Sequence, residues 1–158
     1  MIRPATREDL PTLVGLIHEL AEFESSTDQV EIDEQLLGAA LFDAEPSAFA
    51  RLAVEEDEAV GMVIYSRTFS TWTGRPGIYV VDLYVKPEHR GRRIGHALLG
   101  FIARLAMDEG LARVEWAVLD WNEPAIAFYR SIGAVALDGW TTYRLTGDAL
   151  RSLAETAP

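Results

Sequence analysis

The chain has 158 residues, of which 49% are hydrophobic, and a formal net charge of −11 at pH 7. This length and composition predict a single domain, residues 1–158, with a full hydrophobic core. The acidic balance argues against nucleic acid as a partner, because its phosphates would be repelled. The absence of cysteine excludes disulfides, thiolate metal sites and thiol nucleophiles, and it fits a cytoplasmic protein.

The sequence also disfavours three further features: a membrane span, a signal peptide and a metal site. No apolar run approaches the roughly 20 residues of a membrane span, so we expect no membrane partner. Residues 2–5 lead directly into predicted structure, so we expect no signal peptide. His18, His89 and His96 are scattered without metal-ligand spacing, so we predict no metal site.

The first half of the chain predicts two helices and a hairpin. Residues 2–5 are typical of a short strand, and Thr6 then caps a helix, with Asp9 at the capping-box position. Apolar residues continue at helical spacing, and they are Leu10, Leu13, Val14, Ile17, Leu20 and Ala21. A second short helix is expected from about residue 33 to 41. Residues 48–55 and 60–69 are predicted as paired strands.

The second half predicts alternating strands and helices. Residues 72–77 form a loop rich in glycine and proline, and 78–85 form a strand with Asp82 in its middle. The remaining predicted elements are a helix at 94–108, a strand at 114–119, a helix opening at Asn122, closing strands at 134–137 and 141–145, and a terminal helix at 148–154. This order indicates an α/β layer structure.

A basic turn joins strand 78–85 to helix 94–108. The first amides of a helix lack partners within the helix and carry partial positive charge, which suits a phosphorylated ligand. Arg90, Arg92 and Arg93 add charge, while Gly91 and Gly95 let the backbone approach a ligand closely. The alternative is that these glycines only begin a helix. The acidic remainder of the chain either attracts a cationic substrate or serves solubility.

Three segments, in this order, resemble the GNAT superfamily of acetyl-CoA-dependent N-acetyltransferases. They are Ile2-Arg3-Pro4-Ala5-Thr6-x-x-Asp9, Asp82-Leu83-Tyr84-Val85-x-Pro87-x-x-Arg90-Gly91-x-x-Ile94-Gly95 and Asn122-x-Pro124-Ala125-x-x-Phe128-Tyr129-x-x-x-Gly133-Ala134. The likeness covers essentially the whole chain. It implies an α/β GNAT fold: a mixed, mostly antiparallel sheet of six to seven strands with a splayed central strand pair, flanked by about four helices.

Within this superfamily the chain is most similar to the spermidine/spermine (diamine) acetyltransferase group. The shared residues are Glu19-Leu20-Ala21-x-Phe23-Glu24, Trp72, Trp121-Asn122-Glu123-Pro124-Ala125-Ile126-x-Phe128-Tyr129 and Gly139-Trp140. The resemblance implies acetyl transfer from acetyl-CoA to a primary amine, by direct attack in a ternary complex. It implies a small cationic acceptor, polyamine-like or amino-acid-like, and a homodimer.

The resemblance also implies a set of cofactor-binding residues. They are Leu83, Tyr84, Val85, Arg90, Gly91, Arg92, Arg93, Ile94, Gly95, His96, Asn122, Ala125 and Tyr129. The family usually has glycine at the position of Arg93, so its side chain adds bulk there. Asn122 is either a helix cap or a partner of the pantetheine amides, and both roles can coexist. Tyr129 either packs or acts as general acid for the departing thiolate, since a phenol of pKa about 10 can donate that proton.

The catalytic base is less clearly marked. The polyamine group has an acidic residue where this chain has Val81, and Asp82 follows it. Adjacent strand residues point to opposite faces, so we do not expect Asp82 simply to replace its neighbour. Asp82 is therefore interpreted either as structural or as a base, acting directly or through water.

Four residues are candidates for acceptor binding: Phe23, Glu24, Trp72 and Asp138. Phe23 stands where the polyamine group has tyrosine, and Ser70 lies near the position of another acid of that group. Each carboxylate could instead be merely solvated. The alternative functions are a protein or peptide N-acetyltransferase and a non-catalytic acyl-CoA-binding sensor, which the missing acid at Val81 favours.

Overall fold

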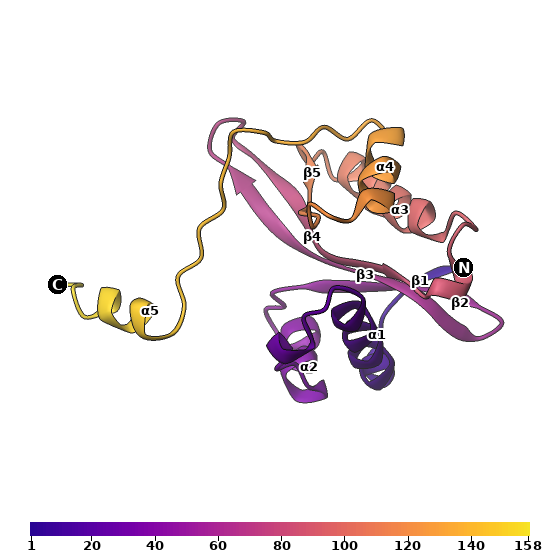
Figure 1. Cartoon of the computed structure of the whole chain (residues 1–158), viewed down its shortest axis with the longest axis horizontal. Helices are drawn as coiled ribbons and strands as arrows, with labels where there is room; N and C mark the ends of the chain where they lie inside the picture. Colours follow the sequence, from indigo (N-terminus) through magenta and orange to yellow (C-terminus); the bar gives the residue numbers. More distant parts are fainter. The chain divides into compact units, whose positions relative to one another are not determined.

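Five strands form one mixed sheet in the order β1-β2-β3-β4-β5 (Figure 1). They are β1 (Ile2–Pro4), β2 (Phe49–Glu55), β3 (Glu58–Ser70), β4 (Arg75–Val85) and β5 (Val114–Glu115). The first four run antiparallel, whereas β5 runs parallel to β4. The computed structural model describes residues 1–158 as two units, Met1–Ala117 and Val118–Pro158, and the sheet belongs to the first.

Helices cover both faces of this sheet. α1 (Leu10–Phe23) and α2 (Glu34–Phe42) lie on one face, and α3 (Ile94–Asp108) lies on the other (Figure 1). The predicted capping box is present on a short 3-10 turn, η1 (Arg7–Asp9), which leads into α1. Asp9 accepts a hydrogen bond from the backbone N–H of Thr6 at 2.8 Å and pairs with Arg3 at 2.7 Å, and these contacts hold its pKa well below the usual range.

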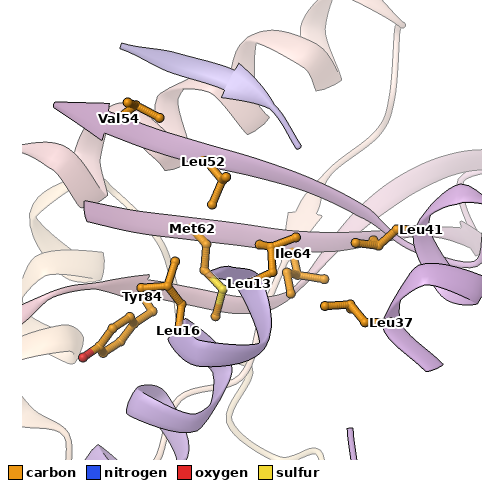
Figure 2. Packing of buried hydrophobic residues seen from close by; sticks show 9 residues of the cluster. All are labelled: Leu13, Leu16, Leu37, Leu41, Leu52, Val54, Met62, Ile64 and Tyr84. Carbon is orange, nitrogen blue, oxygen red and sulfur yellow. The ribbon is translucent and has the colours of Figure 1, made fainter. Parts of the chain in front are cut away.

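The core between α1, α2 and the sheet fixes the position of β4. Its buried side chains come from α1, α2, β2, β3 and β4, and they are Leu13, Leu16, Leu37, Leu41, Leu52, Val54, Met62, Ile64 and Tyr84 (Figure 2). Full burial of one such aliphatic side chain contributes about 1.5–3 kcal/mol. On the opposite face, Leu98 and Ile102 of α3 are fully buried. Strand β4 is therefore held from both sides.

The pairing of β4 with β5 is short. Only Ile78 pairs with Val114 and Tyr79 with Glu115, so no strand pairs with residues 80–85 on that side. The predicted splay of the central strands is therefore present, and β5 is shorter than the expected strand at 114–119. The exposed edge of β4 leaves backbone N–H and C=O groups that a peptide-like ligand can pair with.

The β3–β4 hairpin is longer than predicted. Phe69 pairs with Pro76 and Ser70 with Arg75, so the second half of the expected loop at 72–77 belongs to β4. The glycine and proline of this segment indicated a loop, but the long partner strand β3 extends the pairing past them. Pairing with a neighbouring strand therefore overrides local turn propensity here.

The second unit contains two helices, α4 (Glu123–Ser131) and α5 (Gly147–Ala154). The predicted closing strands at 134–137 and 141–145 are wrong, because neither segment pairs in the sheet. The sheet has five strands rather than six to seven, and there are five α-helices rather than about four. An alternating pattern indicates a face that a strand could bury, but a strand forms only where a partner backbone accepts its hydrogen bonds.

No helix in the structure combines the length and the apolar character that a membrane crossing requires.

Candidate active site

A β-bulge lies in the middle of β4. Val80 pairs with Tyr65, whereas Asp82 pairs with Ile64, so Val81 has no partner in the ladder with β3. A bulge interrupts the alternation of side chains. Simple alternation therefore does not define the face of Val81 relative to that of Asp82. Asp82 follows the bulge on the face that carries Ile64 and Tyr84, which is the face covered by α1.

Asp82 and Glu24 form a pair of interacting carboxyl groups. Burial, together with the smaller effect of the negative charge of Glu24, raises the pKa of Asp82 to about 6. Burial also raises the pKa of Glu24, which directly follows α1. Both shifts show that negative charge is unfavourable here without a compensating cation. The structure thus brings together one predicted acceptor-binding residue and the predicted base, and their environment favours a positively charged ligand.

Arg90 connects the basic turn to the C-terminal end of α1. Its Nε donates a hydrogen bond to the carbonyl of Val85 at 2.9 Å, and its guanidinium carbon lies 4.7 Å from the ring centroid of Phe23 and 5.7 Å from that of Tyr84. Cations over aromatic faces are attracted by the ring quadrupole. The Arg90 side chain is therefore engaged by the protein, beside the predicted acceptor residue Phe23.

Tyr84 is anchored in this region from the other side. Its ring is buried, and burial together with the charge and hydrogen bond of Glu19 raises the pKa of its hydroxyl. Glu19 lies on α1, one turn before Phe23. A neutral Tyr84 therefore holds α1 against β4, close to Asp82 in the strand.

The basic turn has the backbone geometry of an anion site. Gly91 and Arg93 both adopt left-handed conformations, with φ of 75° and 64°, and α3 begins directly afterwards. The N–H groups of residues 91–95 have no acceptor within the chain. Consecutive unpaired amides at the start of a helix of 15 residues attract anions. The turn therefore matches the predicted phosphate site, with backbone amides as its main donors.

We expect Arg93→Gly to raise the free energy of unfolding by about 0.5–1 kcal/mol, measured by urea denaturation. A non-glycine residue in the left-handed region costs about 1–2 kcal/mol, and glycine removes this cost. Glycine also adds conformational entropy to the unfolded chain, which offsets part of the gain in stability. Arg93→Ala retains a Cβ and should give no such gain. An equal gain from alanine would contradict the role of the backbone conformation.

The Arg92 side chain also has a protein partner. Its Nη1 lies 2.9 Å from Oε2 of Glu55, the last residue of β2. His89, in the 3-10 turn η3 (Pro87–His89), contacts the same carboxylate at 3.1 Å. Sequence reasoning did not identify Glu55, because it reaches the site from an element distant in sequence and belongs to no spaced motif. Glu19 belongs to a segment of the resemblance, but the resemblance assigned it no role in the site.

The remaining predicted residues lie elsewhere. Trp72 is 87% exposed in the turn that precedes β4, whereas Asp82 lies near the other end of this strand, so the structure does not bring them together. In the second unit, Asn122 accepts a hydrogen bond from the N–H of Ala125 at 3.3 Å, which confirms its predicted role as a helix cap. Tyr129 lies on α4 beside Phe128, and Asp138 is exposed ahead of Gly139.

The chain is similar to known proteins along nearly its full length. It matches the model of the acetyltransferase (GNAT) family over residues 13–134. It is 40% identical to thialysine N-epsilon-acetyltransferase of Sus scrofa, across 98% of this chain and 96% of that protein. It is 29% identical to spermidine/spermine N(1)-acetyltransferase-like protein 1 of Homo sapiens, across 97% of this chain and 23% of that protein.

A solved structure has the same fold. An integron cassette protein from the mobile metagenome of V. cholerae superposes with a TM-score of 0.82 at 28% identity, over 99% of this chain and 98% of that one. The overall fold is therefore shared by a protein that matches this chain from end to end.

Proposed function

The chain belongs to the acetyltransferase (GNAT) family and is an N-acetyltransferase, and from this premise we propose that it transfers acetyl from acetyl-CoA to the primary amine of a small cationic acceptor. The observation that carries the choice of acceptor is the pair of Asp82 and Glu24, whose carboxyl groups both have raised pKa values. A cation beside them removes their mutual repulsion. The thialysine enzyme of Sus scrofa is, by its name, an Nε-acetyltransferase, which supports an amino-acid-like acceptor.

The first unit offers a fitting site for the acyl donor. The unpaired amides of residues 91–95 suit the pyrophosphate, and the unpaired edge of β4 at Leu83, Tyr84 and Val85 suits the pantetheine arm. Arg90, Arg92 and Arg93 add positive charge to the turn, and Ile94 and His96 open the helix that follows. When bound, acetyl-CoA supplies a thioester carbonyl that an amine can attack.

The residues of the chain supply the proton transfers. Asp82 takes the proton of the acceptor ammonium, directly or through water, because only the neutral amine is nucleophilic. A new C–N bond forms, the C–S bond breaks, and Tyr129 gives its phenolic proton to the thiolate. The attacking nitrogen loses its second proton through solvent, which restores the phenol of Tyr129, and Asp82 releases its proton to solvent. Glu24 pairs with the remaining charge of the acceptor, and Phe23 and Asp138 are proposed as further acceptor contacts. Trp72 is not, because it lies in the turn at the opposite end of β4 from Asp82. Asn122 and Ala125 are proposed to bind the pantetheine.

The domain organisation, the oligomeric state and the location of the protein are proposed from the family match, the resemblance and the composition. The family match over residues 13–134 spans the boundary between residues 117 and 118, which supports a single GNAT domain. The resemblance to the polyamine group supports a homodimer, and the absence of cysteine supports a cytoplasmic location. A non-catalytic acyl-CoA sensor is the second candidate, favoured by the exposed Val81 where that group has an acid.

The proposed function is tested by turnover with a panel of acceptors. We expect acetyl-CoA-dependent acetylation of thialysine, lysine, ornithine and short diamines, and much weaker turnover of a neutral monoamine control that lacks a second charge. Thiol release and product mass measure the reaction. Turnover of peptides alone would identify a protein N-acetyltransferase. Binding of CoA without turnover of any amine would identify the sensor.

A further inference from the structure

The β2–β3 hairpin places two acids side by side next to the basic turn. Glu55 and Glu58 occupy directly opposed positions in the ladder. Like charges in that arrangement are destabilising. Each acid, however, has a basic partner on the segment that follows β4. Glu58 pairs with Lys86 at 2.6 Å, and Glu55 pairs with Arg92. The repulsion within the hairpin is thus offset by contacts to this segment.

Glu55 makes the more extensive of these contacts. Its Oε2 lies 2.9 Å from Nη1 of Arg92 and its Oε1 lies 3.2 Å from Nη2, so the guanidinium is held at both oxygens. Nδ1 of His89 lies 3.1 Å from the Oε2 atom and 3.1 Å from Nη1 of Arg92. A protonated Nδ1 donates to Glu55, and an unprotonated one accepts from Arg92. His89 therefore has a partner in either state.

These contacts flank Gly91 and directly precede Arg93, the strained residue of the turn. Gly91 lies between His89 and Arg92, and Arg93, in the left-handed region, follows at once. Such a conformation persists only where its surroundings hold it in place. Contact of Glu55 with residues on both sides of Gly91 supplies that constraint from a different hairpin. It also directs the Arg92 side chain toward Glu55.

We propose that Glu55 is a positioning residue for the acyl-CoA pyrophosphate: it holds His89 and Arg92 so that the amides of residues 91–95 are aligned before the ligand arrives. This inference rests on the proposed function of the turn. A group aligned in advance binds its ligand at lower entropic cost. Glu55 itself touches no reacting atom, so its removal should affect binding of the donor and leave the chemical step unchanged.

The test compares Glu55→Gln with Glu56→Gln, measured by calorimetric titration with CoA. Both variants lose one negative charge in the same hairpin, but Glu56 is exposed and has no ion pair. We expect Glu55→Gln to weaken CoA binding about tenfold, with a matching rise in KM for acetyl-CoA and no change in KM for the amine. Glu56→Gln should bind CoA as tightly as the wild-type protein, or slightly more tightly.

A double-mutant cycle with Arg92→Gln separates positioning from general destabilisation. If Glu55 acts through Arg92, the double variant should lose no more CoA affinity than the weaker-binding single variant. Equal or tighter CoA binding by Glu55→Gln, or fully additive losses, would overturn the inference. Failure of the wild-type protein to bind CoA would instead contradict the proposed function.

Discussion

Replacing Asp82 by asparagine is expected to lower kcat/KM for the amine by about 10²–10⁴, the usual contribution of a general base. The wild-type enzyme should show a limb in kcat/KM that rises through a pH of about 6, since the pKa of Asp82 is raised to about 6 and only the ionised carboxylate accepts a proton. This limb should be absent from the Asp82→Asn variant. Deprotonation of the free amine itself produces a separate rise at higher pH.

Glu24 provides the matched test of this assignment. Its charge contributes to the raised pKa of Asp82, so Glu24→Gln should move the acidic limb to lower pH and raise KM for cationic acceptors. Glu22→Gln, an exposed change near the end of the same helix, should leave both unchanged. An acidic limb that survives in Asp82→Asn would assign the base to another group.

The Asp82→Asn substitution should also stabilise the folded protein at neutral pH. A carboxyl group whose pKa is higher in the folded state than in the unfolded chain favours folding while protonated. That contribution is lost as the pH rises from the unfolded value of 3.8 through about 6. Above this window the asparagine variant, which bears no charge, should be more stable by roughly 2–3 kcal/mol. Urea denaturation at pH 5 and pH 8 measures the difference, which should be smaller at pH 5.

The fold was predictable from the sequence where local periodicity and burial agree. The apolar spacing of α1 and α3 gives one buried face each, and both helices lie close to their expected bounds. Segments 134–137 and 141–145 have a strand-like pattern but no pairing partner, and they were predicted wrongly. A single sequence specifies which face a segment can bury, whereas pairing depends on residues far along the chain.

The candidate site was predictable where it consists of a local motif. Gly91 and Gly95 marked the basic turn, but nothing in the sequence indicated that Arg93 adopts a left-handed backbone conformation. The bulge at Val81 has no local signature in the sequence, so alternation alone does not indicate how the faces of Val81 and Asp82 are related. Register shifts are set by the pairing of whole strands, and no glycine or proline next to Val81 indicates the bulge there.

Replacing Tyr129 by phenylalanine is expected to lower kcat by about 10²–10⁴ while leaving the affinity for CoA unchanged. The proposed role of its hydroxyl is to protonate the departing thiolate. Phenylalanine keeps the ring that packs beside Phe128 on α4, so the helix should remain intact. Tyr143→Phe is the matched control, since Tyr143 is 92% exposed in the same unit and should tolerate the loss of its hydroxyl.

A comparison of two acetyl donors distinguishes proton transfer by Tyr129 from a role in packing. When the thiol of an acetyl thioester has a lower pKa, its thiolate is a better leaving group and needs less help from a general acid. The defect of Tyr129→Phe should therefore shrink with such a donor and be largest with acetyl-CoA, when both are compared in single-turnover experiments. An equal defect with both donors would show that Tyr129 acts through packing. The general acid would then have to be sought among the other groups near the thioester.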